Sequence, residues 1–282
     1  MTFQRTSVLA AALAAVTFAP AAFAADVAPR GTAPVQYLRP APVSEWVITL
    51  GAEARFSPRY EGADNMRLLP FPVFRVRKGG TPEEFRSPRD GASIALLNLG
   101  PFKLGPTAKI KTQRKESDDS DLAGLGDVKW TVELGAFAEY WVTDMVRTRA
   151  EVRQGIGGHH GVVADFTADF VYPVTQQLTV SAGPRLTAAT SAALDPYFSV
   201  TPGQSVASGL PVYDAGGGIK SYGVGAQAIY AWSPQWRSNV FVEYDRLTGD
   251  TANSPLVSQR GKRDQFQVGT GLTYSFNIPA WW

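Results

Sequence analysis

The sequence contains no cysteine and only two histidines among its 282 residues. The absence of cysteine excludes disulfides, thiolate metal sites and cysteine nucleophiles together. The two histidines, His159 and His160, are adjacent, so any histidine-dependent chemistry has to use one of them. The composition therefore offers little to an enzyme that depends on either residue type.

A charge excess and a long apolar run are also missing. The 27 lysines and arginines nearly balance the 25 aspartates and glutamates, which gives a net charge of +2. This balance argues against a nucleic-acid-binding protein, which normally carries a basic excess on one face. Beyond residue 24 there is no run of about 20 apolar residues, which excludes a helical membrane protein.

The first 24 residues have the three parts of a secretory signal peptide. Arg5 provides the positive charge, residues 8–18 form an uncharged apolar core, and Ala22-Phe23-Ala24 matches the small-x-small cleavage pattern. We therefore predict cleavage between Ala24 and Ala25. Residues 25–44 are rich in alanine and proline, and we interpret them as an extended periplasmic leader.

From Glu45 onward the hydrophobic pattern repeats every two residues, as in β-strands. A soluble antiparallel sheet also has one apolar and one polar face, but it could not bury a row of charges such as Arg147, Arg149, Glu151 and Arg153. The polar lumen of a membrane barrel can do so. The predicted strands also have about 10–14 residues, where globular strands usually have about 5–6. We predict an all-β fold, a transmembrane antiparallel β-barrel in the outer membrane of a Gram-negative bacterium.

The lengths of the connections predict the topology. Long connections at 113–127, 154–161, 190–217 and 249–261 alternate with short turns, and bacterial barrels place the long loops outside the cell. Eleven strands are clear, at about 45–56, 67–77, 91–98, 102–113, 128–142, 145–154, 161–172, 177–189, 218–232, 235–248 and 262–276. An odd number would leave the N-terminus outside, so one more strand is needed, and residues 82–87 offer the place. We predict twelve strands within residues 45–276, with ten as the alternative, followed by a tail of residues 277–282.

The inward-facing positions carry both signs of charge in similar number. Twelve strands lie between the eight-stranded barrels that side chains fill and the sixteen-stranded barrels that leave a channel. Mixed charges across such a narrow lumen favour a cross-linked, largely closed interior over an open pore. The charge network that we predict for the lumen consists of Glu133, Glu139, Arg147, Arg149, Glu151, Arg153, Asp165 and Asp169.

His159 and His160 lie in a glycine-rich segment, which predicts an extracellular hairpin turn in which the two side chains bond to neighbouring loops. A zinc site needs three or four ligands, and this segment offers two imidazoles and no thiolate. The acidic residues 116–121 lack the glycine and the closing glutamate of an EF-hand, so we interpret them as a solvated loop. No nucleotide-binding motif is complete. We therefore expect no catalytic, cofactor-binding or metal-binding residues.

Several stretches resemble the MipA/OmpV family of outer-membrane proteins. They are Leu125-Gly126-Asp127, RAEVRQGIGGHHGVVADFTADFVYP (149–173), SAGPRLT (181–187), PYFSVTPGQSVASGLPVYDAGGGIKS (196–221), RLTGDTANSPLV (246–257) and RGKRDQFQVGTGLTYSF (260–276). The resemblance covers roughly residues 46–276 and implies an outer-membrane barrel without catalytic residues. For one branch of the family it implies a scaffold that links a lytic murein transglycosylase to a peptidoglycan synthase.

Three functions remain open at this point. The scaffold for murein enzymes depends mainly on the resemblance, a narrow channel or porin for small solutes depends on the charged lumen, and a surface adhesin depends on the long loops. In each case outer-membrane lipid and lipopolysaccharide are the expected surroundings, and nucleic acid is not an expected partner.

Overall fold

The computed structural model describes residues 45–81 and 83–279. The predicted signal peptide, its cleavage between Ala24 and Ala25, and the leader of residues 25–44 lie outside the described residues, as does the end of the predicted tail. The described part contains no helix that is long and apolar enough to cross a membrane.

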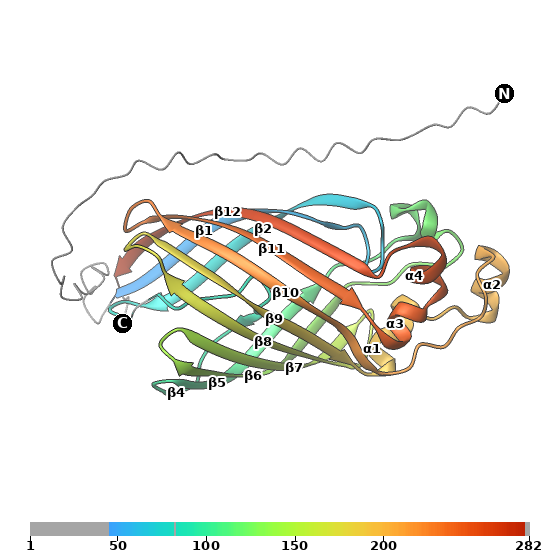
Figure 1. Ribbon diagram of the computed structural model, residues 1–282, viewed down its shortest axis with the longest axis horizontal. Helices are drawn as coiled ribbons and strands as arrows, with labels where there is room; N and C mark the ends of the chain where they lie inside the picture. Colours follow the sequence, from blue (N-terminus) through green and yellow to red (C-terminus); the bar gives the residue numbers. More distant parts are fainter. Residues whose placement is uncertain (1–44, 82, 280–282) are drawn as a thin grey trace, which may run out of the picture. The chain divides into compact units, whose positions relative to one another are not determined.

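Twelve strands form one antiparallel sheet that curls into a barrel (Figure 1). The order along the sheet is β2-β1-β12-β11-β10-β9-β8-β7-β6-β5-β3, and β4 also pairs with β5. The strands are β1 (Glu45–Pro58), β2 (Met66–Lys78), β3 (Ala92–Ser93), β4 (Leu97–Leu99), β5 (Phe102–Lys111), β6 (Thr131–Thr143), β7 (Val146–Gly157), β8 (Val162–Pro173), β9 (Leu178–Ala189), β10 (Gly218–Ala231), β11 (Trp236–Leu247) and β12 (Asp264–Pro279).

Alternation along each strand sends apolar side chains outward and charged side chains inward. On β7, Val152 is 53% exposed and the adjacent Arg153 is 2% exposed. The same contrast holds on β6 between the exposed Leu134 and the buried Glu133. A soluble protein would bury the apolar set, whereas here it forms the surface that faces lipid. The predicted β-barrel is thus confirmed.

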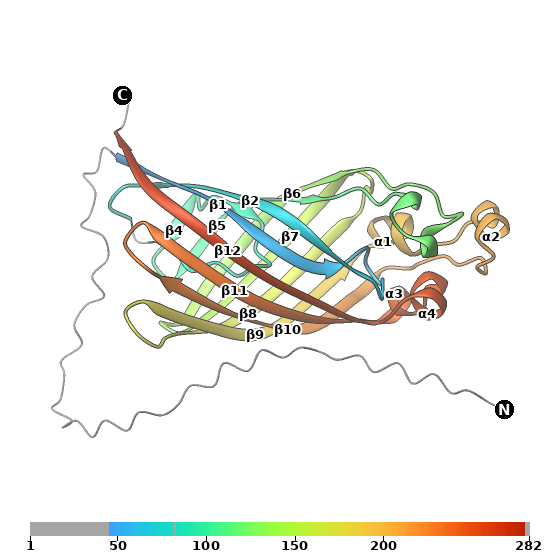
Figure 2. The same ribbon diagram turned by 90° about the horizontal axis from the view of Figure 1, so that it is seen from above.

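The two ends of the barrel differ (Figures 1 and 2). One end has short turns, such as the one between β6 and β7, and we call it the turn end. The other end, the loop end, carries the long connections, two 3-10 turns (Glu116–Asp118 and Ser120–Leu122) and four short helices. The helices are α1 (Ser191–Phe198), α2 (Pro202–Ser208), α3 (Gly249–Asn253) and α4 (Pro255–Arg260).

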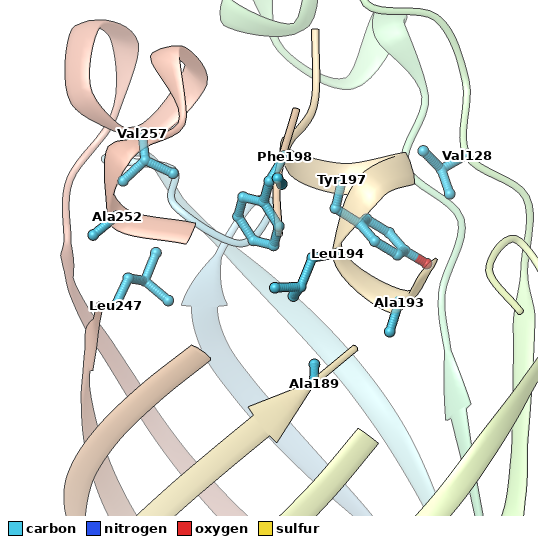
Figure 3. Packing of buried hydrophobic residues seen from close by; sticks show 10 residues of the cluster. Val128, Ala189, Ala193, Leu194, Tyr197, Phe198, Leu247, Ala252 and Val257 are labelled. Atoms are coloured by element: carbon cyan, nitrogen blue, oxygen red, sulfur yellow. The ribbon is translucent and has the colours of Figure 1, made fainter. Parts of the chain in front are cut away.

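Three of these helices pack over the mouth of the barrel. Tyr197 and Phe198 of α1, Ala252 of α3 and Val257 of α4 meet in a buried apolar cluster above the end of β9 (Figure 3). In contrast, α2 buries no side chain. The connection that was expected only as a long loop therefore contains a small apolar core.

The sheet has two edges, which are β2 and the pair β3–β4, and no backbone ladder joins them among the described residues. Pro70 and Pro72 lie on the edge strand β2 and face outward two positions apart. Their missing N–H groups therefore point to the same side of the strand. An edge strand has no neighbouring strand on one side, so its backbone needs no N–H donors there. Proline is therefore tolerated on that side.

The predicted strand at 82–87 is wrong. Residues 83–87 have no regular secondary structure, and Pro82 lies outside the described residues. The count of twelve is nevertheless confirmed, because the strand expected at 91–98 is divided into β3 and β4. The last strand also continues beyond Phe276, and Asn277 and Ile278 pair with Val47 and Trp46 of β1.

The outward position of Val152 leads to a first prediction. Val152→Arg should lower the free energy of unfolding by about 2–4 kcal/mol, because a guanidinium near the bilayer midplane loses its hydration. Val152→Leu keeps the apolar surface and should change it little. Urea titration of the barrel folded into lipid vesicles measures both. Equal stability of the two variants would contradict the assignment of this face to lipid.

Candidate functional site

The inward charges of β6, β7 and β8 form one continuous network of ion pairs. Arg147 contacts Glu139 at 2.8 Å and Asp169 at 3.3 Å, and its side chain is 1% exposed. Arg149 contacts Glu139 at 3.2 Å and Glu151 at 2.7 Å. Because each guanidinium bridges two or more carboxylates, the charges are compensated without water.

The network continues along the wall in both directions. Arg153 pairs with Glu133 at 3.0 Å, with Glu151 at 2.6 Å and with Asp165. On the other side, Arg185 of β9 contacts Asp169 at 2.7 Å and Glu243 of β11 at 3.3 Å. All eight residues predicted for the lumen network thus lie inside the barrel and are paired.

Residues 83–91, which we call the lumen segment, cross the interior between β2 and β3. Near the turn end, Glu83 contacts Arg75 of β2 at 3.8 Å and Arg237 of β11 at 2.8 Å. The adjacent Glu84 contacts Lys103 of β5 at 2.7 Å. Two successive carboxylates therefore bind the two sides of the open edge, one to β2 and one to β5.

Further along, the lumen segment connects opposite walls of the barrel. Asp90 binds Arg147 of β7 at 2.7 Å, and the Gly91 N–H donates to Glu151 at 3.1 Å. Arg89 extends to the far wall, where it binds Asp245 of β11 and lies 3.5 Å from Glu243. The segment thereby supplies the additional crossing that the parity of the strands requires, but inside the lumen and not in the wall.

His159 is not a loop contact, which corrects the sequence-based expectation. It is 1% exposed, its Nε2 lies 3.1 Å from Glu133 Oε1, and its Nδ1 accepts from the Gly161 N–H. Both ring nitrogens are therefore occupied, and neither is available to a nucleophile. His160 is exposed, and its carbonyl accepts a hydrogen bond from the side chain of Gln154.

The loop between β1 and β2 closes the mouth with a further charge cluster. Glu61 contacts Lys111 of β5 at 2.7 Å and also binds Lys220 of β10. Burial opposes ionisation of Glu61, but attraction by these two ammonium groups outweighs it and holds the pKa of the carboxyl well below its usual range. Lys111 also lies 3.4 Å from the ring centroid of Tyr197, a cation–π contact. The mouth is thus held by charge as well as by the apolar cluster.

Salt bridges cross the interior of the barrel from several strands. The carboxylates of the network are engaged by guanidinium or ammonium groups, so their charges are paired. No group of three or more histidine or acidic side chains within residues 45–81 and 83–279 is placed to hold a metal ion. The candidate site is therefore the lumen with its network of paired charges.

Comparison with known proteins identifies the family. A family model described as "MltA-interacting protein MipA" matches residues 50–276. No curated protein matches the sequence.

Several solved structures are similar at low identity. An outer-membrane channel from Pseudomonas putida F1 is 10% identical with a TM-score of 0.42, over 87% of this chain and 100% of that one. The KdgM porin is 12% identical with a TM-score of 0.38, over 82% and 99%. A loop-deletion mutant of OmpT, an outer membrane protein of Vibrio cholerae, is 10% identical with a TM-score of 0.38, over 83% and 100%.

Proposed function

Because the chain belongs to the MipA family, we propose that this outer-membrane β-barrel protein is a non-catalytic scaffold for enzymes that hydrolyse and synthesise murein. The observation that supports the proposal is the lumen segment, which binds β2, β5, β7 and β11 through paired charges. A porin needs a continuous aqueous path, and we infer that these contacts obstruct it. A barrel obstructed in this way would act through its surface.

The partners would bind on the periplasmic side, because murein lies there. The family description points to a lytic transglycosylase, and a peptidoglycan synthase is the second partner that we propose. The turn end has little surface of its own, since its turns are short. The leader of residues 25–44 has the composition of an extended segment, which docks in a groove at low entropic cost.

Deletion of residues 27–42 tests this proposal. Pull-down from membranes should capture a lytic transglycosylase or a peptidoglycan synthase with the full chain and lose it with the deletion variant. Heat-modifiable gel mobility provides the folding control. Unchanged capture by the folded variant would exclude the leader, and no capture by the full chain would exclude the scaffold function.

A second candidate function is adhesion through the loop end. Helix α2 buries none of its side chains, and Val206 on it is 90% exposed. Helix α2 therefore presents its side chains at the loop end without packing them against the barrel, where another surface could contact them. Val206→Asp should abolish binding to host cells if α2 carries adhesion, whereas Ser205→Asp adds the same charge beside it as a control.

The orientation of the barrel leads to a second prediction. Protease added to intact cells should cut first within 202–209, because this exposed segment lies at the loop end. The turns at 143–145 and 233–235 should remain uncut until the outer membrane is opened. Mass spectrometry of the fragments gives the sites. Early cleavage at these turns in intact cells would mean that the barrel has the opposite orientation.

A further inference from the structure

A pocket of about 460 Å³ opens where the loop end meets the outer wall of β9 and β10. Its lining includes Leu186, Ile219 and Tyr222, which are outward-facing side chains of these strands. Ile219 is 53% exposed and Tyr222 is 49% exposed, so this wall is continuous with the surface that faces lipid. Its lining also includes Leu194 of α1, a member of the apolar cluster in Figure 3.

The polar side of the pocket contains two groups that have no partner. Asp250 lies on the lining, and among the described residues no hydrogen bond or ion pair engages its carboxylate. Its neighbour Thr251 is 1% exposed, and its Oγ1 is buried without a hydrogen-bond partner. Buried hydroxyls are nearly always hydrogen-bonded, so an unpaired one beside a pocket points to a ligand.

Gly216 leaves the space that the carboxylate of Asp250 occupies. A Cβ on Gly216 would lie 2.3 Å from Oδ2 of Asp250, so any side chain there would displace the acid. The pKa of Tyr213 is raised, first by burial and then by the negative charges of Asp250 and Asp214. The pocket thus combines an apolar wall with an uncompensated negative charge.

We propose that this pocket binds an amphiphile that joins an ammonium group to an apolar chain. The chain would lie along Leu186, Ile219 and Tyr222, and the ammonium group would bind Asp250. A hydrogen-bonding group next to the ammonium would reach Thr251. An anionic amphiphile does not fit, because the carboxylate would repel it at short range.

A nitroxide-labelled alkylammonium ion tests the proposal on the full-length protein in nanodiscs. Methyl NMR measures relaxation enhancement at Leu186 and Ile219, and Val152 on the lipid face of β7 serves as the reference for simple partitioning into lipid. The enhancement at the pocket should exceed that at Val152, and a nitroxide-labelled fatty-acid anion should give no such excess. Equal enhancement at the pocket and at Val152, or equal response to the anion, would overturn the proposal.

Three variants identify the recognising groups. Asp250→Asn should weaken binding about tenfold, the loss expected for one charge-assisted contact. Thr251→Val keeps the shape and should weaken it about threefold, whereas a hydroxyl without a ligand role would leave binding unchanged. Asp195→Asn removes an exposed carboxylate of α1 outside the pocket and should have no effect. Unchanged binding in Asp250→Asn, with heat-modifiable mobility intact, would exclude the pocket as an ammonium site.

Discussion

Arg147→Met should lower the free energy of unfolding by about 3–5 kcal/mol, the largest effect that we expect from a single substitution. Arg147 binds Asp90, Glu139 and Asp169, and all four side chains are at most 5% exposed. Methionine fills part of the volume but leaves these carboxylates with fewer cations. The cost comes from buried charge that water cannot reach.

Urea titration of the barrel in lipid vesicles, followed by tryptophan fluorescence, measures this effect. Arg246→Met is the matched control, because Arg246 pairs with Asp264 where both side chains are more than 40% exposed. Water replaces an exposed pair at little cost, so the control should stay close to wild type. If the two variants were destabilised equally, the buried network would contribute no more to stability than an exposed ion pair does.

Arg89→Gln/Asp90→Asn should convert a silent barrel into a conducting one. These two residues attach the lumen segment to opposite walls, Arg89 to β11 and Asp90 to β7. Amides retain the shape but lose the charge-assisted bonds, so the segment should detach and open an ion path. We expect discrete conductance steps in a planar bilayer at least about tenfold more often than in wild type, since the loss of about 1.4 kcal/mol already shifts an equilibrium tenfold.

The control for this experiment is Arg246→Gln/Asp264→Asn, which removes one charge of each sign from an exposed pair. It should remain as silent as wild type. Conductance steps in both double variants would attribute the effect to general loosening of the barrel. A silent Arg89→Gln/Asp90→Asn barrel would show that the lumen segment does not close the path.

The wall of the barrel could be predicted from the sequence because its signal is local. Alternation at Arg147, Arg149, Glu151 and Arg153 gave the inward face of β7, since neighbouring residues in a strand must point to opposite sides. The same alternation identified Val152 as facing lipid. These predictions required no knowledge of distant contacts.

The lumen segment could not be predicted, because its structure depends on partners far away in the chain. Arg89 binds Asp245, 156 residues away, and nothing in the local pattern around Arg89 indicates this contact. The odd number of clear strands correctly required one more crossing of the barrel. It could not show whether this crossing is a strand of the wall or a segment inside the lumen. Pro70 and Pro72 did indicate that the sheet has an edge at this strand, since two prolines on one face are typical of an edge strand.

The burial of His159 and the loop helices were missed for different reasons. The contact of His159 with Glu133 joins residues 26 apart, so it depends on how the hairpin folds back over β6. Helix α2 did have a local signal. Thr201 and Gln204 form a capping box around Pro202, and this pattern marks a helix start even within a β protein.

Single-channel recording of the unmodified protein in a planar bilayer tests the closed lumen most directly. With the ion pairs of Arg89, Asp90, Glu83 and Glu84 intact, we expect a stable baseline without conductance steps. Stable ohmic conductance from heat-modifiable, correctly folded wild-type protein would contradict it and would favour the channel over the scaffold.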